Sequence, residues 1–111
     1  MKTKEQTKIP LAFKKKLVDT LRSNRYKQGF DCMYNTQENS YDVLGVAHRI
    51  AGVDKQIING MQMPLGTHHK FLPNCLSGNC SDMSMINKLN YLNNVKKMPF
   101  KWTAHYIEKH M

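Results

Sequence analysis

The sequence predicts one α+β domain that is predominantly helical, with about four helices and a small extended or β-hairpin element. The 111 residues match the usual size of a single domain, and 41% of them are hydrophobic, which suffices for a packed core. Four segments carry apolar residues at helical spacing, whereas a segment between the first two alternates. We expect residues 1–111 to form this domain, with residues 1–8 as a flexible basic tail.

The first helix is expected from Lys8 to Ser23, because an apolar stripe runs along this segment and Pro10 suits a first helical turn. The stripe comprises Ile9, Phe13, Leu17, Val18 and Leu21. Residues 26–34 then alternate in character and residues 35–40 are polar. A short strand or extended loop, followed by a turn, is therefore expected after the first helix.

A second helix is expected over Tyr41–Ala51, with Gly52 as its stop signal. Asn39 or Ser40 can cap its first turn. A glycine inside a helix costs about 1 kcal/mol relative to alanine. We therefore expect a close neighbour to require the space at Gly45.

The segment 53–79 is expected to be mainly loop, because several glycine and proline residues interrupt it. Only residues 56–58 and 70–72 have the composition to pair there as short strands. Long loops of this kind are often functional.

The third helix is expected to begin at Ser81 or Asp82 and to end near Asn93, and Pro99 opens a fourth. Both are amphipathic and are expected to face each other. On the fourth helix, one face carries Phe100, Ala104, Ile107 and Met111, and another carries Trp102 and Tyr106. The expected core contains Phe13, Leu17, Leu21, Leu44, Ile50, Ile86, Leu89 and Ile107.

The charge is strongly positive and concentrated at the two ends of the chain. There are 17 Lys and Arg against 8 Asp and Glu, a net charge of +9. Residues 1–28 carry a net charge of +7 and residues 83–111 carry +4, whereas residues 29–82 carry −2. Such a field favours encounters with nucleic acid, acidic protein grooves or small anions.

The candidate binding residues are the basic side chains near both ends of the chain and two aromatic residues of the fourth helix. The third helix, the connector of residues 95–98 and the fourth helix can form a basic helical hairpin whose second helix enters a nucleic-acid groove. The complete candidate set is Lys14, Lys15, Lys16, Arg22, Arg25, Lys27, Lys96, Lys97, Lys101, Trp102 and Tyr106.

Catalysis finds no positive support, because the sequence contains no phosphate-binding loop, dinucleotide fingerprint, nucleophile elbow or zincin helix. Cys32 with His48 or His105 as base is a weak candidate for a nucleophilic pair. We expect a protein that is not an enzyme and needs no cofactor.

One loop carries four residues of the types that bind zinc: His68, His69, Cys75 and Cys80. Their spacing differs from the two tight pairs of a structural zinc site, so we expect no metal, and zinc remains the alternative. An odd number of cysteines and the lack of a secretion signal favour free thiols in the cytoplasm. No run of apolar residues is long enough to span a membrane.

Several short motifs resemble a family of small uncharacterised proteins from tailed phages and prophages. They are Leu21-Arg22-Ser23, Tyr26-Lys27-Gln28-Gly29, Ser40-Tyr41, Leu44-Gly45-Val46-Ala47, Leu89-Asn90, Phe100 and Tyr106-Ile107-Glu108. The similarity spans residues 17–109 and implies a phage origin more than an activity. Where that family tends to have cysteines, this chain has Asp42, Val43 and His48. We expect the shared glycines Gly29 and Gly45 to allow close backbone approach.

The resemblance and the charge together favour a non-catalytic accessory protein that binds a host protein or ribonucleoprotein machine and inhibits or modulates it. An anti-CRISPR or other anti-defence factor is an example of such a protein, and it would act in the host cytoplasm. One alternative is direct nucleic-acid binding through the basic helical hairpin. Another is capture of a small anionic nucleotide by basic residues around the 53–80 loop.

Overall fold

The first helix, α2 (Leu11–Arg22), begins directly after Pro10, whose carbonyl accepts the Lys14 N–H at 2.8 Å. The computed structural model describes residues 9–64, 66–67, 69–78 and 83–111, so the expected helix start at Lys8 and the expected tail 1–8 lie outside it. Leu17, Val18 and Leu21 form the buried face of the helix, as their spacing predicts.

The expected extended element is a small antiparallel hairpin of β1 (Tyr34–Asn35) and β2 (Ser40–Tyr41), in which Tyr34 lies opposite Tyr41. Residues 27–29 run beside β2, since Gly29 N–H donates to the Tyr41 carbonyl at 2.7 Å. A Cβ atom on Gly29 would collide with the Ser40 hydroxyl, so the expected close approach is confirmed.

Helix α3 (Val43–Ala51) is the central helix, and most of its side chains are buried. Its cap is Asp42, whose Oδ1 accepts the Gly45 N–H at 2.7 Å, so the helix begins two residues later than expected and neither Asn39 nor Ser40 caps it. It ends, as predicted, at Gly52, which is left-handed with φ 104°. A Cβ atom on Gly45 would collide with the Met33 carbonyl oxygen, which is the close neighbour that the sequence required.

The two segments of the 53–79 loop that could have paired as short strands, 56–58 and 70–72, do not do so. Lys55–Ile58 is instead the helix α4, because Asp54 accepts the Gln56 N–H at 2.8 Å and favours a helical turn. Residues 70–72 form a turn, in which Leu72 N–H donates to the His69 carbonyl at 3.0 Å. A single 3-10 turn, η1 (Asn74–Leu76), follows Pro73.

The third helix has two parts. Helix α5 (Ser84–Asn90) leads into a π-helical segment, η2 (Tyr91–Val95), in which Lys96 N–H donates to the Tyr91 carbonyl at 3.0 Å. The expected start at Ser81 or Asp82 lies outside the described residues. After a short connector, Pro99 precedes α6 (Phe100–His110), as expected.

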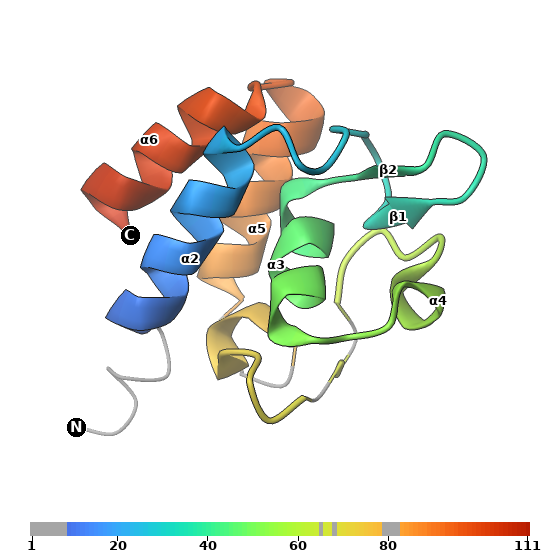
Figure 1. Ribbon diagram of the computed structural model, residues 1–111, viewed down its shortest axis with the longest axis horizontal. Coiled ribbons are helices and arrows are strands. Elements are labelled where there is room, and N and C mark those ends of the chain that lie inside the picture. The colour runs from blue at the N-terminus through green and yellow to red at the C-terminus, as the bar shows by residue number, and fades with distance from the viewer. Residues whose placement is uncertain (1–8, 65, 68, 79–82) are drawn as a thin grey trace.

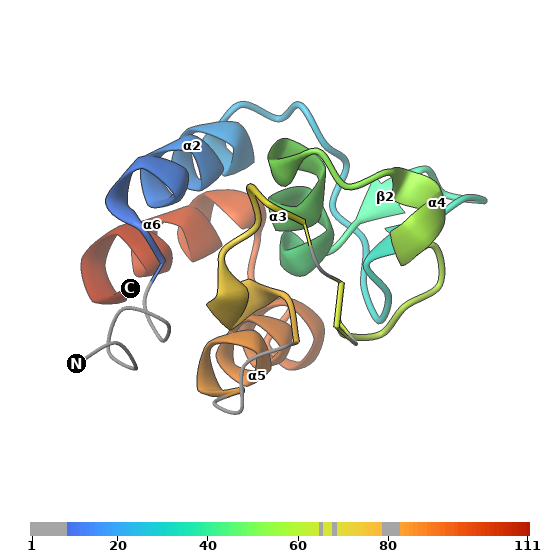
Figure 2. The same ribbon diagram turned by 90° about the horizontal axis from the view of Figure 1, so that it is seen from below.

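Helices α2 and α6 lie side by side and run in opposite directions, α3 lies between this pair and the hairpin with α4, and α5 lies behind α3 (Figures 1 and 2). Helix α6 packs mainly on α2 and meets the preceding helical segment at η2, rather than facing α5 along its length as expected. The packing joins residues of α2, α3, α5 and α6 into one core.

The protein is a compact globule, about 53% helical, with four helices of seven or more residues and a two-stranded hairpin among the described residues, which confirms the predicted fold class. Six of the eight expected core residues are buried, and Phe13 and Ile50 pack partly buried against them. No helix in the described part of the chain is long and apolar enough to cross a lipid bilayer.

Candidate binding surface

Helix α6 presents two chemically different faces, as its sequence predicts. Phe100, Ala104 and Ile107 are buried against the core. Trp102 lies on the outer face with 56% of its surface exposed, although burying a tryptophan is strongly favourable. The exposed Trp102 makes this face a candidate contact surface because it lies at a concavity.

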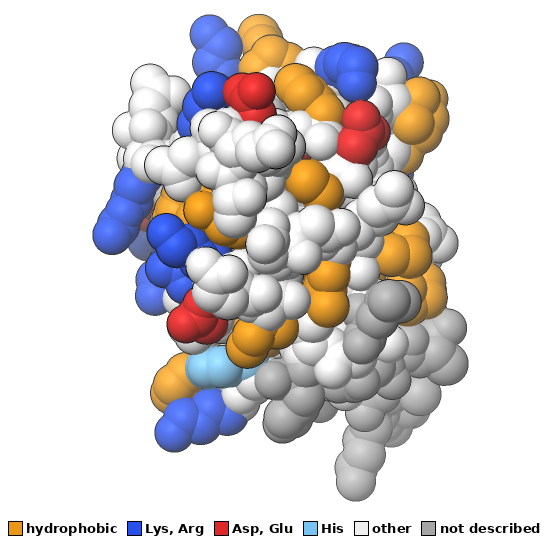
Figure 3. All heavy atoms as spheres, turned by 90° about the vertical axis from the view of Figure 1, so that its right-hand side faces the viewer, with side chains coloured by type: hydrophobic (Ala, Val, Ile, Leu, Met, Phe, Trp, Pro, Cys, Tyr) orange, Lys and Arg blue, Asp and Glu red, His pale blue; other side chains and the backbone are white. Residues whose placement is uncertain are grey.

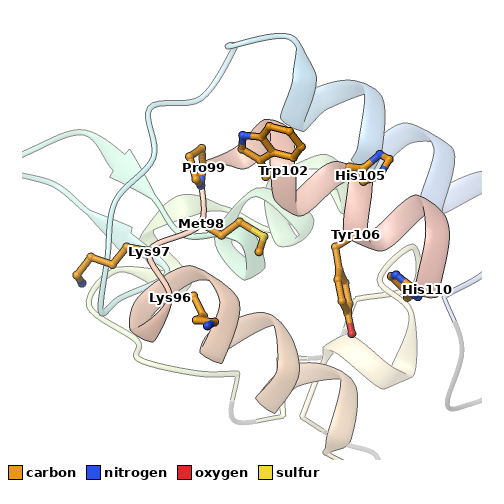
Figure 4. Close-up of a pocket in the computed structure, with 8 residues that line it drawn as sticks. All are labelled: Lys96, Lys97, Met98, Pro99, Trp102, His105, Tyr106 and His110. Atoms are coloured by element: carbon orange, nitrogen blue, oxygen red, sulfur yellow. The ribbon is translucent and has the colours of Figure 1, made fainter.

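The outer face borders a concave surface of about 460 Å³, which we call the α6 hollow (Figure 4). The connector supplies one side of the hollow and α6 supplies the other. Its lining residues are Lys96, Lys97, Met98, Pro99, Trp102, His105, Tyr106 and His110, and none of them is acidic.

The aromatic side chains of the hollow are ordered by contacts with histidines. The Trp102 and His105 rings meet edge to face at 6.4 Å between centroids, and Tyr106 lies 4.7 Å from His110. In Figure 4, Tyr106 and His110 extend from α6 toward α5. Lys88 of α5 completes this side, because its Nζ lies 5.4 Å from the centroid of the Tyr106 ring.

The two connector lysines differ in how firmly they are held. Lys97 has a left-handed backbone with φ 52°, and its Nζ donates to the Asn94 carbonyl at 3.0 Å and lies 4.6 Å from the Phe30 ring centroid. The Lys96 side chain is exposed, and its ammonium makes no hydrogen bond or ion pair within the described part of the chain. Lys96 is therefore the connector cation that is more available to a partner.

A buried amide network behind the connector fixes the shape of the hollow. Gln28 Nε2 donates to the Met98 carbonyl at 2.8 Å, and its Oε1 accepts the Phe100 N–H at 3.0 Å. The same Nε2 reaches Asn93 Oδ1 at 3.1 Å, and Asn93 also accepts the Val43 N–H. The first N–H groups of a helix have no acceptor within the helix, and Gln28 supplies one for Phe100. Gln28 thereby ties the start of α6 to the α2–β1 segment.

The lysine triplet of α2 does not form one cationic patch. Lys14 and Lys15 border a groove beside Glu108, whereas Lys16 donates to the Ile50 carbonyl on the α3 side. Arg22 is bound to Glu108 through an Nη2–Oε1 contact of 2.8 Å. This hydrogen bond lowers the pKa of Glu108 and raises that of Arg22.

The three remaining candidates, Lys101, Arg25 and Lys27, do not line the α6 hollow. Lys101 is exposed on α6, next to Trp102. Arg25 and Lys27 line a separate pocket near the hairpin, where Lys27 pairs with Glu38 at 3.3 Å. Of the eleven sequence-predicted residues, the structure therefore brings together Lys96, Lys97, Trp102 and Tyr106, with Lys101 beside them.

Two of the groups considered for nucleophilic chemistry, Cys32 and His48, have surroundings that disfavour their reactive forms. Burial, followed by the charges of Asp42 and Asp31, raises the pKa of the Cys32 thiol, so the reactive thiolate is disfavoured. His48 is buried, with Nδ1 at 2.7 Å from the Leu44 carbonyl and Nε2 at 2.7 Å from the Thr67 hydroxyl. Burial lowers the pKa of His48 to about 4, so the ring is neutral near pH 7. Both of its nitrogens are used in structural hydrogen bonds.

The structure describes two of the four candidate zinc ligands. His68 and Cys80 lie outside the described residues. Cys75 is buried, and His69 Nδ1 accepts the Phe71 N–H at 3.2 Å. Within the described ranges, no three His, Cys, Asp or Glu side chains come close enough to hold a metal ion.

The sequence-based set missed Lys88, His105 and His110 of the binding surface, and Gln28 and Asn93 behind it. Helical spacing could have found His105, since it lies three residues after Trp102 on the same face. Lys88 comes from another helix and has no such signal. Comparison of the chain with family models, with curated proteins and with solved structures finds no match.

Proposed function

We propose that this protein is a non-catalytic binding protein of phage type, which modulates a host macromolecular machine by occupying it with the α6 hollow. The observation that carries the proposal is the exposure of Trp102 beside Lys96 and Lys97 in a concave surface without carboxylates. Tryptophan and tyrosine are the side chains that most often dominate binding energy at protein interfaces. The phage origin rests on the resemblance of the sequence motifs.

The partner surface that complements the hollow is acidic and has a groove for an aromatic side chain. Lys96, Lys97 and Lys101 would steer the encounter, and burial of Trp102 and Tyr106 would slow dissociation. Glu108 is the one acid among residues 83–111, and it is bound to Arg22. Because Arg22 neutralises Glu108, this carboxylate of α6 does not oppose the positive charge around the hollow.

A capture experiment with host lysate tests this function. The wild-type protein is expected to retain one host protein after nuclease treatment and at high salt, and Trp102→Ala is expected to lose it. Phe71→Ala is the matched control, because Phe71 is also aromatic and 64% exposed but lies on another surface. Equal capture by wild-type protein and Trp102→Ala would reject the α6 hollow as the contact.

Direct nucleic-acid binding is the second candidate, and the alternation of cations with aromatic rings along α6 favours it. Lys101, Trp102, His105 and Lys109 are all exposed on this helix. Trp102 is the single tryptophan of the chain, so its fluorescence reports stacking on a base directly. Quenching by a single-stranded oligonucleotide that weakens steeply with salt would support this candidate over the protein partner.

A further inference from the structure

A second concave surface lies at the opposite end of the fold from the C-terminus, where the α2–β1 segment meets the hairpin. Its volume is about 470 Å³, within the usual range of roughly 300–1,000 Å³ for small-molecule sites. We call it the Arg25 pocket, and it is lined by residues 24–27, Glu38, Asn39, Tyr41 and Lys55. It shares no residue with the α6 hollow.

The Arg25 pocket has more positive than negative charge. Three cations line it, and one of them, Lys27, is bound to Glu38 at 3.3 Å. Arg25 and Lys55 make no ion pair with any described acid. On the face of the molecule that carries the hairpin and α4, Lys and Arg side chains gather along one edge (Figure 3). Two cations without acidic partners thus border one cavity.

Aromatic rings hold these two cations in place. The Arg25 guanidinium lies 5.9 Å from the centroid of the Tyr26 ring, and the Lys55 ammonium lies 5.6 Å from that of Tyr34. The rings themselves are packed together, with Tyr41 at 5.0 Å from Tyr26 and 4.8 Å from Tyr34. Each cation therefore lies beside one ring of a packed aromatic cluster, which is a weakly favourable contact at an exposed site.

The backbone around the pocket is fixed as well. Tyr41 N–H donates to the Lys27 carbonyl at 2.9 Å, which joins the two segments that form the walls. Asn24 and Asn39 have left-handed backbones, with φ of 61° and 51°, and both line the pocket. Asparagine tolerates this conformation better than most residues, and it also provides an amide that can bind hydroxyl or phosphate oxygens.

We propose that the Arg25 pocket binds a small phosphomonoester, with the phosphate between Arg25 and Lys55. A phosphomonoester carries a charge between about −1.5 and −2 at neutral pH, which matches the two cations without acidic partners. The guanidinium can bind two phosphate oxygens at once, and the asparagine amides and tyrosine hydroxyls suit the hydroxyl groups of a sugar. Among the lysines of the 53–80 loop, Lys55 is the one that faces this pocket.

Calorimetric titration of the full chain tests the proposal, with adenosine 5′-monophosphate, glucose 6-phosphate and inorganic phosphate as probes. At least one of the two phosphomonoesters is expected to bind and to raise the melting temperature with the logarithm of its concentration. Adenosine and glucose, which lack the phosphate, are expected not to bind. Absence of binding by every phosphate probe at millimolar concentration would overturn the proposal.

Variants assign the binding to this pocket. Lys55→Met and Arg25→Gln are each expected to weaken binding at least tenfold, whereas Lys70→Met, an exposed lysine outside the pocket, leaves it unchanged. Circular dichroism spectra verify that the variants fold. Unchanged affinity in both pocket variants would overturn the assignment, and binding of a phosphoserine peptide alone would replace the small ligand by a protein partner.

Phosphate binding by the Arg25 pocket does not depend on the proposed function of the α6 hollow. Trp102→Ala is expected to bind the phosphomonoester normally, and Lys55→Met is expected to capture the same host partner as the wild-type protein. Binding is also expected to weaken below about pH 6, where the phosphate loses its second charge. Loss of phosphate binding in Trp102→Ala would place the ligand in the α6 hollow and contradict the proposal.

Discussion

Gln28 and Asn93 are 65 positions apart in the sequence, yet Gln28 Nε2 donates to Asn93 Oδ1 at 3.1 Å. Asn93 is fully buried, accepts the Val43 N–H as well, and donates to the Gly29 carbonyl at 3.0 Å. One amide therefore connects the α2–β1 segment, the start of α3 and the π-helical turn. Buried amides of this kind are costly to remove because their partners lose their hydrogen bonds.

Asn93→Ala is expected to destabilise the protein by about 3 kcal/mol, because several buried polar groups lose a partner at once. Asn87→Ala is the matched control, since Asn87 is exposed on α5, and it should change stability by less than about 0.5 kcal/mol. Urea denaturation of both variants measures the difference. Equal stability of the two variants would contradict the role of the Asn93 network.

Gly45→Ala is expected to destabilise the protein, although the helix propensity of alanine alone predicts a gain of about 1 kcal/mol. The added Cβ would collide with the Met33 carbonyl oxygen, which is backbone and cannot move aside cheaply. A loss of about 2 kcal/mol or more is expected from thermal or chemical unfolding. Gly60→Ala is a comparison that isolates backbone strain, because Gly60 has a left-handed φ of 77° and no atom lies near enough to collide with an added Cβ.

Two buried titratable groups of α3 should affect stability in opposite directions. Burial raises the pKa of Asp42 to about 7 from 3.8, so the folded state holds this proton more tightly than the unfolded state does. The contribution of Asp42 to stability therefore falls as the pH rises from about 4 to about 7. The pKa of His48 is about 4 instead of 6.5, so its contribution rises with pH between those values.

The stability of the wild-type protein should therefore change little between about pH 5 and about pH 6.5. Asp42→Asn retains an oxygen for the Gly45 N–H and should grow more stable as the pH rises, by up to about 1.4 kcal/mol per unit. His48→Gln should do the reverse. Urea denaturation of the three proteins across this interval measures the slopes, and parallel slopes would refute the opposing assignments.

Removal of the exposed ion pair between Arg22 and Glu108 should raise the pKa of Glu108 and have little effect on the stability of the fold. Arg22→Gln is expected to return the pKa of Glu108 toward its ordinary value, because the Arg22 hydrogen bond is the largest cause of its decrease. Little change in melting temperature is expected, since the two side chains are 40% and 54% exposed and surface pairs contribute little. NMR titration of the Glu108 carboxyl measures the pKa.

The apolar periodicity of the sequence was sufficient to predict the helices, because burial of one helix face follows directly from residue spacing. It placed Leu17, Leu21 and Ile107 in the core and left Trp102 on the other face of α6. The spacing of Gly45 and Gly52 likewise predicted a close contact and a helix end. These are local effects, so they can be found without knowledge of the fold.

The errors arose where long-range contacts or competing capping groups decide the structure. Ile57 and Ile58 are β-branched and compatible with a strand, but the Asp54 cap produces a helical turn. The packing of α6 on α2 rather than along α5 and the hydrogen bond between Gln28 and Asn93 are long-range contacts, which no local pattern indicates. The Arg25 pocket likewise joins residues from three separate segments.

The π-helical turn η2 sets the rotational phase of the chain between α5 and the connector. A π turn accommodates one more residue than an α turn does, and each residue of an α-helix rotates by about 100°. Deleting one residue from Tyr91–Val95 would therefore leave an α turn of nearly the same total rotation, so the connector and α6 would keep their orientation relative to α5. The same deletion within α5 would rotate all later residues by about 100°, so a one-residue deletion should be better tolerated in η2 than in α5.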